Sequence, residues 1–196
     1  MGSPPPPRVF LLSPADCAGD RARLILSPRA AFPLAVRLRD GGATLGEVMS
    51  FMSGLYFRGK LAYARAFARP PQGVLVITPN AGLLAAEQIV TLVDLRRFAR
   101  GEVREDRPGY RRPLLAAARA LAAALPPEGD VVLLGSIATD KYLGPLAPVF
   151  GPRLLYPRPF VGIGDMSRGA LLLRAVRAGV ELEYAPLTGV MHRSRT

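Results

Sequence analysis

The stretch DVVLLGSIATDKYLGP, residues 130–145, indicates the fold class of this 196-residue chain. It begins with an apolar run, 130–134, that leads directly into small and polar residues and then into Asp140, Lys141 and Tyr142. A continuous apolar run of this length is typical of a strand that is covered on both faces, as in a parallel sheet. A buried strand needs only a turn after it, so these polar residues are either a helix cap or part of a site.

Other apolar segments repeat this form. The segments 8–12, 73–77 and 153–157 are predicted strands bounded by turn residues, and 180–186 is a weaker fifth. Helices are predicted between them, from capping and amphipathic patterns, at 44–57, 58–68, 91–100, 110–125 and 165–179. This alternation predicts a single α/β domain with a mostly parallel central sheet of about four to five strands, flanked by helices.

The ends of the chain differ from this domain. Residues 1–7 are rich in proline and are expected to form a disordered leader, whereas 188–196 form a polar, basic tail. The single domain is therefore expected to span 8–187. The leader has neither the apolar core nor the cleavage site of a signal peptide, so a cytoplasmic location is expected.

Composition excludes several classes of protein. Hydrophobic residues make up 49% of the chain, which excludes a disordered protein. The longest apolar block, 114–125, is too short to span a membrane and contains Arg119. Cys17 is the single cysteine and cannot form an internal disulfide, and one histidine is too few for a zinc site. We therefore expect no metal, no cofactor and no membrane partner.

The charge of the chain is strongly positive. It has 26 Lys and Arg residues against 15 Asp and Glu, which gives a net charge of +11. All but two of these cations are arginines, as a GC-rich genome would produce, yet such a bias does not explain the scarcity of acidic residues. A charge of this size favours polyanions, so nucleic acid or a nucleotide is the expected partner. The sequence does not indicate an oligomeric state.

Polar residues follow each of the four main predicted strands. The carboxyl ends of parallel strands share one edge of a sheet, where ligands of open α/β sheets bind. Each of these residues could instead start a turn or cap a helix. A shared site at this edge would take its ligand-binding residues from the four exits, namely Ser13, Thr78, Asn80, Ser136, Thr139, Lys141, Tyr142, Gly164, Ser167 and Arg168.

Some of these residues suggest chemistry. Glycines such as Gly164, beside hydroxyl side chains at a helix start, are typical of anion cradles, although no Walker or dinucleotide motif is present. Arg168 and Lys141 would bind phosphate, and Tyr142 would stack on a base. If a carboxylate activates water, the candidates on this edge are Asp16, Asp140 and Asp165, and the sequence does not rank them.

Two further segments are rich in cations. Basic and aromatic residues alternate at 54–65, which is typical of nucleic-acid contacts, and the candidates there are Tyr56, Arg58, Lys60 and Arg65. The alternative is an amphipathic helix with its aromatic residues in the core and its cations in water. The densest basic cluster, partly neutralised by Glu102, Glu105 and Asp106, consists of Arg96, Arg97, Arg100, Arg104, Arg107, Arg111 and Arg112.

Short motifs along the chain are similar to those of a known family. In order, they are Ser13-Pro14-Ala15, Gly54-Leu55-Tyr56, Gly82-Leu83-Leu84, the block Ser136 to Tyr142, and Met166-Ser167-Arg168. Over 8–185 the chain resembles the peroxide-stress YaaA family and its shorter relatives. The resemblance implies a cytoplasmic, single-domain α/β protein that binds DNA and protects against oxidative damage. The chain departs from the family by having Asp16 where the family has lysine, and by lacking room for its helix-hairpin-helix insertion.

Two functional hypotheses follow. The first is a nucleic-acid-binding, YaaA-like protein whose affinity falls with salt. The alternative is an enzyme that hydrolyses the N-glycosidic bond of a nucleotide or nucleoside, or acts on a nucleobase. In that enzyme Asp140 or Asp16 would orient water, while Arg168 and Ser167 would hold phosphate. A third possibility is a scaffold in which the strand exits are only well-capped turns.

Overall fold

The computed structural model describes residues 5–70 and 73–187 of the chain. Its strands are β1 (Arg8–Leu12), β2 (Ala43–Thr44), β3 (Val74–Ile77), β4 (Leu83–Ala85), β5 (Ile89–Val90), β6 (Asp130–Leu134), β7 (Leu154–Pro157) and β8 (Tyr184–Pro186). Its α-helices are α1 (Asp20–Leu26), α2 (Pro33–Asp40), α3 (Leu45–Ser53), α4 (Leu55–Phe67), α5 (Leu92–Ala99), α6 (Pro108–Ala124), α7 (Asp140–Phe150) and α8 (Asp165–Ala178). Short 3-10 turns at Gly151–Arg153 and Arg158–Phe160 flank β7.

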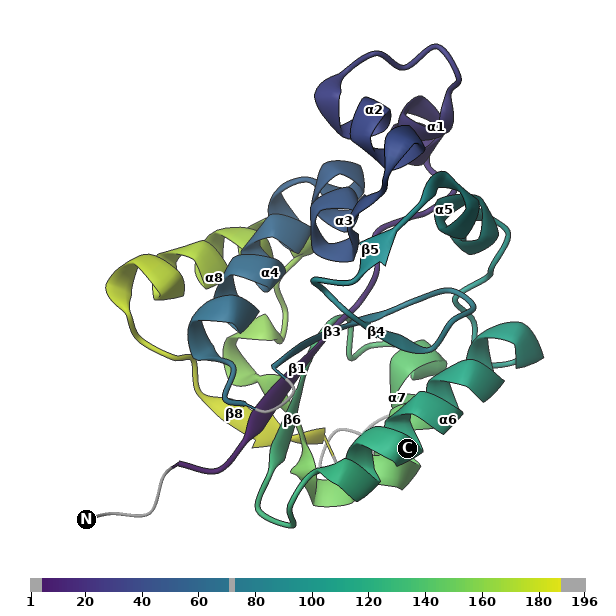
Figure 1. Ribbon diagram of the computed structural model, residues 1–196. Helices are drawn as coiled ribbons and strands as arrows, with labels where there is room; N and C mark the ends of the chain where they lie inside the picture. Colours follow the sequence, from purple (N-terminus) through teal and green to yellow (C-terminus); the bar gives the residue numbers. More distant parts are fainter. Residues whose placement is uncertain (1–4, 71–72, 188–196) are drawn as a thin grey trace.

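A six-stranded central sheet organises the molecule, in the order β4-β3-β1-β6-β7-β8 (Figure 1). The four inner strands are parallel, whereas β4 and β8 close the two edges as antiparallel strands. The prediction of a single α/β domain with a mostly parallel sheet is confirmed. The weak fifth strand is shorter than expected, and β4 was not predicted because its residues were read as part of a strand exit.

Helices cover both faces of the sheet (Figure 1). Phe10 and Leu12 of β1 face a core shared with α1 to α5 and α8. Val9 and Leu11, which alternate with them along the strand, face a second core shared with α6 and α7. This burial on both sides explains why β1 and β6 read as continuous apolar runs rather than as alternating ones.

Glycines determine where α4 lies. Gly54, with φ of 71°, ends α3 and starts α4, so α4 begins earlier than the sequence pattern predicts. Inside α4, a Cβ added to Gly59 would lie 2.7 Å from the carbonyl oxygen of Gly169 in α8. The two helices therefore approach closely at this glycine pair, and this packing fixes the position of α4 beside α8.

The ends of the domain differ slightly from expectation. The carbonyl oxygen of Pro7 accepts a hydrogen bond of 3.0 Å from the backbone N–H of Asp130. The folded body therefore takes in the last part of the expected leader, while the expected basic tail at 188–196 lies outside the described residues. Across the ranges that are described, none of the helices has both the length and the apolar character needed to cross a bilayer.

Candidate functional site

The sheet has a topological switch point between β1 and β6. The two strands are adjacent and parallel, but β1 leads to α1 on one face of the sheet and β6 leads to α7 on the other. The chain therefore diverges at the carboxyl ends of these strands, which is where open α/β sheets bind their ligands. The exits of β1, β6 and β7 surround this point.

Ser13 lies at the centre of the switch point. Its backbone N–H donates to the carbonyl oxygen of Leu134 at 3.1 Å, which extends the pairing of β1 with β6 by one residue. A Cβ added to Gly135 would lie 3.0 Å from Cβ of Ser13, so the glycine allows the two exits to approach each other. The Ser13 side chain consequently fills the space between them and is only 5% exposed.

Lys60 reaches Ser13 from α4. Its Nζ lies 2.6 Å from the carbonyl oxygen and 2.8 Å from Oγ of Ser13, and the residue is 1% exposed. The amine also lies over the ring of Tyr56, 4.4 Å from its centroid, and over the ring of Phe57. Sequence reasoning missed this pairing, because nothing in the segment 54–65 identifies which of its cations turns inward.

The surroundings of Lys60 favour its neutral form. Burial lowers the pKa of Lys60 from 10.5 to about 7, because a charged amine loses its water shell in the core. The carboxylate of Asp165 opposes this shift, whereas the cations of Arg168 and Lys141 add to it. The two aromatic faces also favour the cation but do not outweigh burial. An appreciable fraction of Lys60 is therefore uncharged near neutral pH.

Two buried tyrosines complete the group around Ser13. Burial raises the pKa of Tyr142, and a hydrogen bond with the Ser13 side chain acts in the opposite direction. Tyr56 is 7% exposed, and its hydroxyl has no hydrogen-bond partner within the described residues. Burial raises the pKa of Tyr56 to about 12, with Arg168 opposing. A buried hydroxyl without a partner is unfavourable by about 1–3 kcal/mol, so an acceptor at this position would stabilise the site.

The start of α8 borders the same group. Arg168 donates from Nε and Nη2 to the carbonyl oxygen of Phe160, at 3.3 and 3.1 Å, and from Nη1 to Asp165 Oδ1 at 3.3 Å. The side chain of Arg168 is 12% exposed, against 68% for Asp165. Arg168 thus ties the exit of β7 to α8 rather than pointing into solvent. Gly164 precedes the helix without a side-chain cap, and Ser167 is exposed.

The three candidate carboxylates are not equivalent. Asp165 contributes to the pKa of Lys60, of Tyr56 and of Tyr142, whereas Asp16 and Asp140 are not among the charges that act on these groups. Asp16 accepts a hydrogen bond of 2.9 Å from the N–H of Ala18 and so holds its own turn. Of the three candidates, Asp165 is therefore the carboxylate that acts electrostatically on the group around Ser13.

The exit of β6 and the lone cysteine have local roles. Ser136 accepts a hydrogen bond from the N–H of Ala138 at 3.3 Å, and Thr139 precedes α7 without a side-chain cap.

Cys17 is buried, and burial raises its pKa to about 12, so the thiol stays protonated and is a poor nucleophile.

The exit of β3 lies beside that of β1, because the two strands pair in parallel, but its polar side chains form their hydrogen bonds elsewhere. Thr78 is buried, donates to the carbonyl oxygen of Gly82 at 2.9 Å and accepts from the N–H of Ala81 at 3.0 Å. Asn80 donates to the carbonyl oxygen of Arg97 at 2.6 Å. Both side chains stabilise the turn after β3 and its contact with α5. Within the described residues, neither side chain forms a hydrogen bond to Ser13 or Lys60.

The basic and aromatic segment 54–65 also needs correction. Tyr56 and Lys60 are buried, so they cannot lie on a surface that holds a nucleic-acid strand. Arg58 and Arg65 are exposed, and Arg65 forms an ion pair of 2.7 Å with Glu87. The alternative of an amphipathic helix is confirmed for the aromatic residues, while Lys60 departs from both interpretations because it turns into the core.

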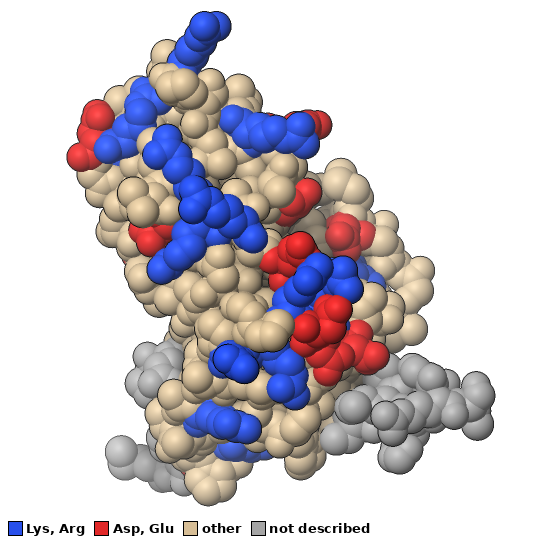
Figure 2. All heavy atoms as spheres, turned by 90° about the vertical axis from the view of Figure 1, so that its right-hand side faces the viewer, with Lys and Arg blue, Asp and Glu red and all other residues tan. Residues whose placement is uncertain are grey.

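The predicted arginine cluster forms an exposed face. Figure 2 shows the side of the molecule on which α5 and α6 lie, where basic side chains form a band interrupted by acidic groups. We name this the arginine face, and it comprises Arg96, Arg97, Arg100, Arg104, Arg107, Arg111, Arg112 and Lys141. Ion pairs engage Arg97, Arg104 and Arg107. Within the described residues, Arg96, Arg100, Arg111 and Arg112 have no ion-pair partner.

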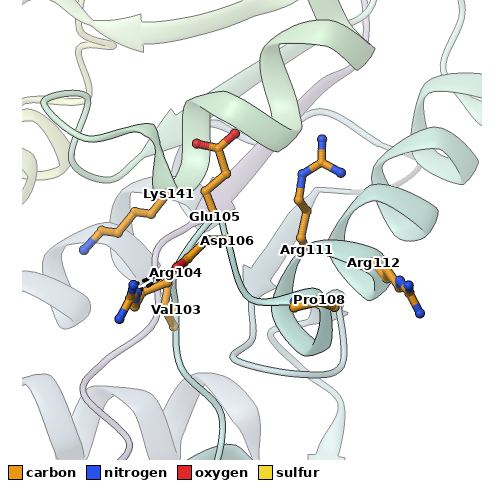
Figure 3. Close-up of a pocket in the computed structure, with 8 residues that line it drawn as sticks. All are labelled: Val103, Arg104, Glu105, Asp106, Pro108, Arg111, Arg112 and Lys141. Atoms are coloured by element: carbon orange, nitrogen blue, oxygen red, sulfur yellow. Dashed lines mark hydrogen bonds and ion pairs between the residues drawn. The ribbon is translucent and has the colours of Figure 1, made fainter.

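A hollow of about 750 Å³ lies at the end of the arginine face. It is bordered by Arg104, Glu105, Asp106, Arg111 and Arg112, together with Lys141 at the start of α7. In Figure 3, Glu105 points toward α7 and Arg112 points away from it, while Arg104 pairs with Asp106 at 2.7 Å. The hollow combines four cations with two carboxylates.

Comparison of the chain with protein-family models, curated proteins and solved structures gives no match. The similarity to the YaaA family accordingly stays a prediction based on the short motifs.

Proposed function

We propose that the protein binds nucleic acid through the arginine face. The observation that carries this proposal is the set of exposed arginines without ion-pair partners in the described structure, Arg96, Arg100, Arg111 and Arg112. An unpaired, exposed guanidinium can contact a phosphate without first breaking an internal ion pair. DNA binding is also what the resemblance to the YaaA family implies, and protection against oxidative damage in the cytoplasm belongs to the same proposal.

Charge across the face supports contact with a phosphate backbone rather than a single anion. The cations extend from α5 through the segment 100–107 to the start of α6, and they alternate with acidic residues. Such a band can neutralise several phosphates, and each neutralised phosphate releases counterions. Four contacts would give a slope of log affinity against log salt of about −3 to −4.

The test is a titration of labelled single-stranded and duplex DNA, followed by fluorescence anisotropy across a salt series. The variant Arg111→Ala/Arg112→Ala removes two cations from the arginine face. Its matched control, Arg174→Ala/Arg177→Ala, removes two exposed cations from α8, on the opposite face of the sheet. We expect the first variant to lose about 10-fold or more in affinity, with a shallower salt slope by about 2, and the control to change much less.

Equal losses in both variants would mean that net charge alone attracts DNA, and no binding at low salt would remove the proposal.

A second candidate is the enzyme expected at the strand ends, which would hydrolyse an N-glycosidic bond. It is favoured by one observation, namely that Asp165 lies among the groups around Lys60 and Tyr56. The carboxylate of Asp165 would stabilise positive charge that develops on the sugar. The same oligonucleotides, incubated and examined for released bases, distinguish this activity from binding alone. Release that persists in Asp165→Asn would contradict this role for Asp165.

A further inference from the structure

We propose that Ser13 and Lys60 form a serine–lysine catalytic pair that hydrolyses a carboxylic ester or amide. The inference starts from the 2.8 Å contact between Oγ of Ser13 and Nζ of Lys60 at the switch point of the sheet. It does not rest on nucleic-acid binding, which uses a different surface. The arginine face and this pair can therefore be tested separately.

The geometry satisfies what a nucleophile and its base require. A base must lie within about 2.6–3.2 Å of the hydroxyl that it deprotonates, and a third group must orient the base. The Ser13 carbonyl oxygen performs this orienting role, because it lies 2.6 Å from the same nitrogen. A neutral amine has two N–H groups and one lone pair. One N–H can donate to that carbonyl while the lone pair accepts the Oγ–H proton.

Lys60 is placed to act as a base near neutral pH. Burial is the main reason that its pKa falls to about 7, and few charges face it. These are Asp165 and Arg168 from α8 and Lys141 from α7. A base with a pKa near the working pH combines an unprotonated fraction with useful basicity. An ordinary, exposed lysine would be almost fully protonated and could not accept a proton from serine.

The orphaned hydroxyl of Tyr56 indicates where the substrate oxygen would lie. The centroid of its ring lies 4.4 Å from Nζ of Lys60, and its hydroxyl has no hydrogen-bond partner among the described residues. A carbonyl oxygen bound there would accept this hydrogen bond, which would strengthen as negative charge develops on the oxygen. One donor suits the single oxygen of a tetrahedral acyl intermediate. For this reason we assign an acyl group, rather than a phosphoryl group, as the substrate.

The reaction has two balanced steps. Oγ of Ser13 attacks the carbonyl carbon as its proton passes to Nζ of Lys60, and the bond to the leaving alcohol or amine then breaks as Lys60 returns that proton to it. Water next attacks the acyl-serine ester, giving a proton to Lys60, and the acid is released as Ser13 Oγ recovers a proton. The net reaction consumes one water and yields an acid and an alcohol or amine.

Access to Ser13 is narrow. Ser13 is only 5% exposed, so a small electrophile is the appropriate probe. A fluorophosphonate reacts with an activated serine by forming a bond from Oγ to phosphorus and expelling fluoride. We expect one adduct per chain, located at Ser13 by peptide mass spectrometry, with a rate that rises through pH 7 and then levels off.

Variants separate this role from a structural one. Ser13→Ala should abolish the adduct, and Lys60→Met, which matches the lysine in length without a base, should slow labelling by about 100-fold or more. Hydrolysis of p-nitrophenyl acetate should fall in parallel. Ser27→Ala, at the end of α1 and remote from the pair, is the control that should label like the wild type.

Either of two results would overturn the proposal: no adduct at Ser13 in the folded wild-type protein at pH 9, or equal labelling rates in Lys60→Met and wild type. If Lys60→Met fails to fold, the test is the pH dependence of the labelling rate of the wild-type protein alone. A labelling rate that does not change between pH 6 and 9 then excludes Lys60 as the base, because its titration would have to appear in that range.

Discussion

The exits of β1 and β3 look alike in the sequence and behave differently in the fold. Each is a buried apolar strand followed by a hydroxyl residue and a proline, Ser13-Pro14 and Thr78-Pro79. Thr78 uses its hydroxyl within its own turn, bonding to Gly82 and Ala81. The Ser13 hydroxyl instead accepts a hydrogen bond from Lys60, which lies 47 residues away along the chain. The same local pattern therefore serves either a turn or a site.

The difference follows from what each strand does next. The chain turns back after β3 to form the antiparallel strand β4, so the Thr78 hydroxyl finds its hydrogen-bond partners within the same turn. After β1 the chain crosses to the helical layer and returns only at β3. The side chains at that exit are left for partners brought by other elements. A strand exit that opens a crossover connection is thus the better place to search for a site.

The largest effect in this comparison should come from Gly82→Ala, which breaks the turn after β3. Gly82 has a φ of 71°, and an added Cβ would lie 2.6 Å from the carbonyl oxygen of Pro113. Left-handed backbone and overpacking together should lower the free energy of unfolding by about 2–5 kcal/mol, measured by urea denaturation. Gly162→Ala is the control, since its φ is 76° but its added Cβ would meet nothing within 4 Å.

If Gly162→Ala lowers the free energy of unfolding as much as Gly82→Ala does, the destabilisation comes from backbone conformation alone and not from the contact with α6.

The next effect concerns the exit of β1 and depends on pH. The folded-state pKa of Lys60, about 7, lies below the unfolded value of 10.5, so the unfolded chain binds more protons between these limits. The free energy of unfolding should therefore rise with pH across this window and be lowest below pH 7. The slope should approach about 1.4 kcal/mol per pH unit.

The measurement is a set of urea denaturation curves from pH 7 to 9 for wild type and Lys60→Met. The difference between them should change by about 2–3 kcal/mol in favour of wild type as the pH rises. Parallel curves for the two proteins would mean that Lys60 is not desolvated in solution.

The smallest effect should come from Thr78→Val, which keeps the shape of the side chain but removes the hydroxyl. Two hydrogen bonds of the turn after β3 are lost, which should lower the free energy of unfolding by about 1–2 kcal/mol. Thr78→Ser should recover most of this. Labelling of Ser13 should be unchanged in both, because the Thr78 hydroxyl bonds within its own turn and not to Ser13 or Lys60. A slowed reaction at Ser13 would show that the exits are coupled after all.

Much of the fold could be predicted from the sequence. The strands at 8–12 and 130–134 have the predicted bounds, and Thr91 caps the helix α5 at the start of the predicted segment 91–100. The edge strand β4 and the small pairing of β2 with β5 were missed because these strands are only two or three residues long, and β2 and β5 are also distant in the chain. Short strands carry little apolar pattern of their own.

The candidate site could be predicted only in part. Ser13, Tyr142, Asp165 and Arg168 were expected at the shared edge and lie close to it, because parallel strands with both faces covered bring their exits together. Lys60 was expected on the surface. A lysine among aromatic residues is expected both in a nucleic-acid contact and in a helix that turns the amine into the core. The sequence pattern therefore could not distinguish these two positions for Lys60.

The sequence by itself determined the elements that depend on near neighbours: buried strands, helix caps and the excess of arginine. These follow from apolar periodicity, from hydrogen bonds between residues three or four positions apart, and from composition. Only the tertiary structure decided that α4 packs against α8 through Gly59 and that Lys60 of α4 reaches Ser13. The pKa of an amine depends on the water and charge around it, and packing across the whole domain sets both.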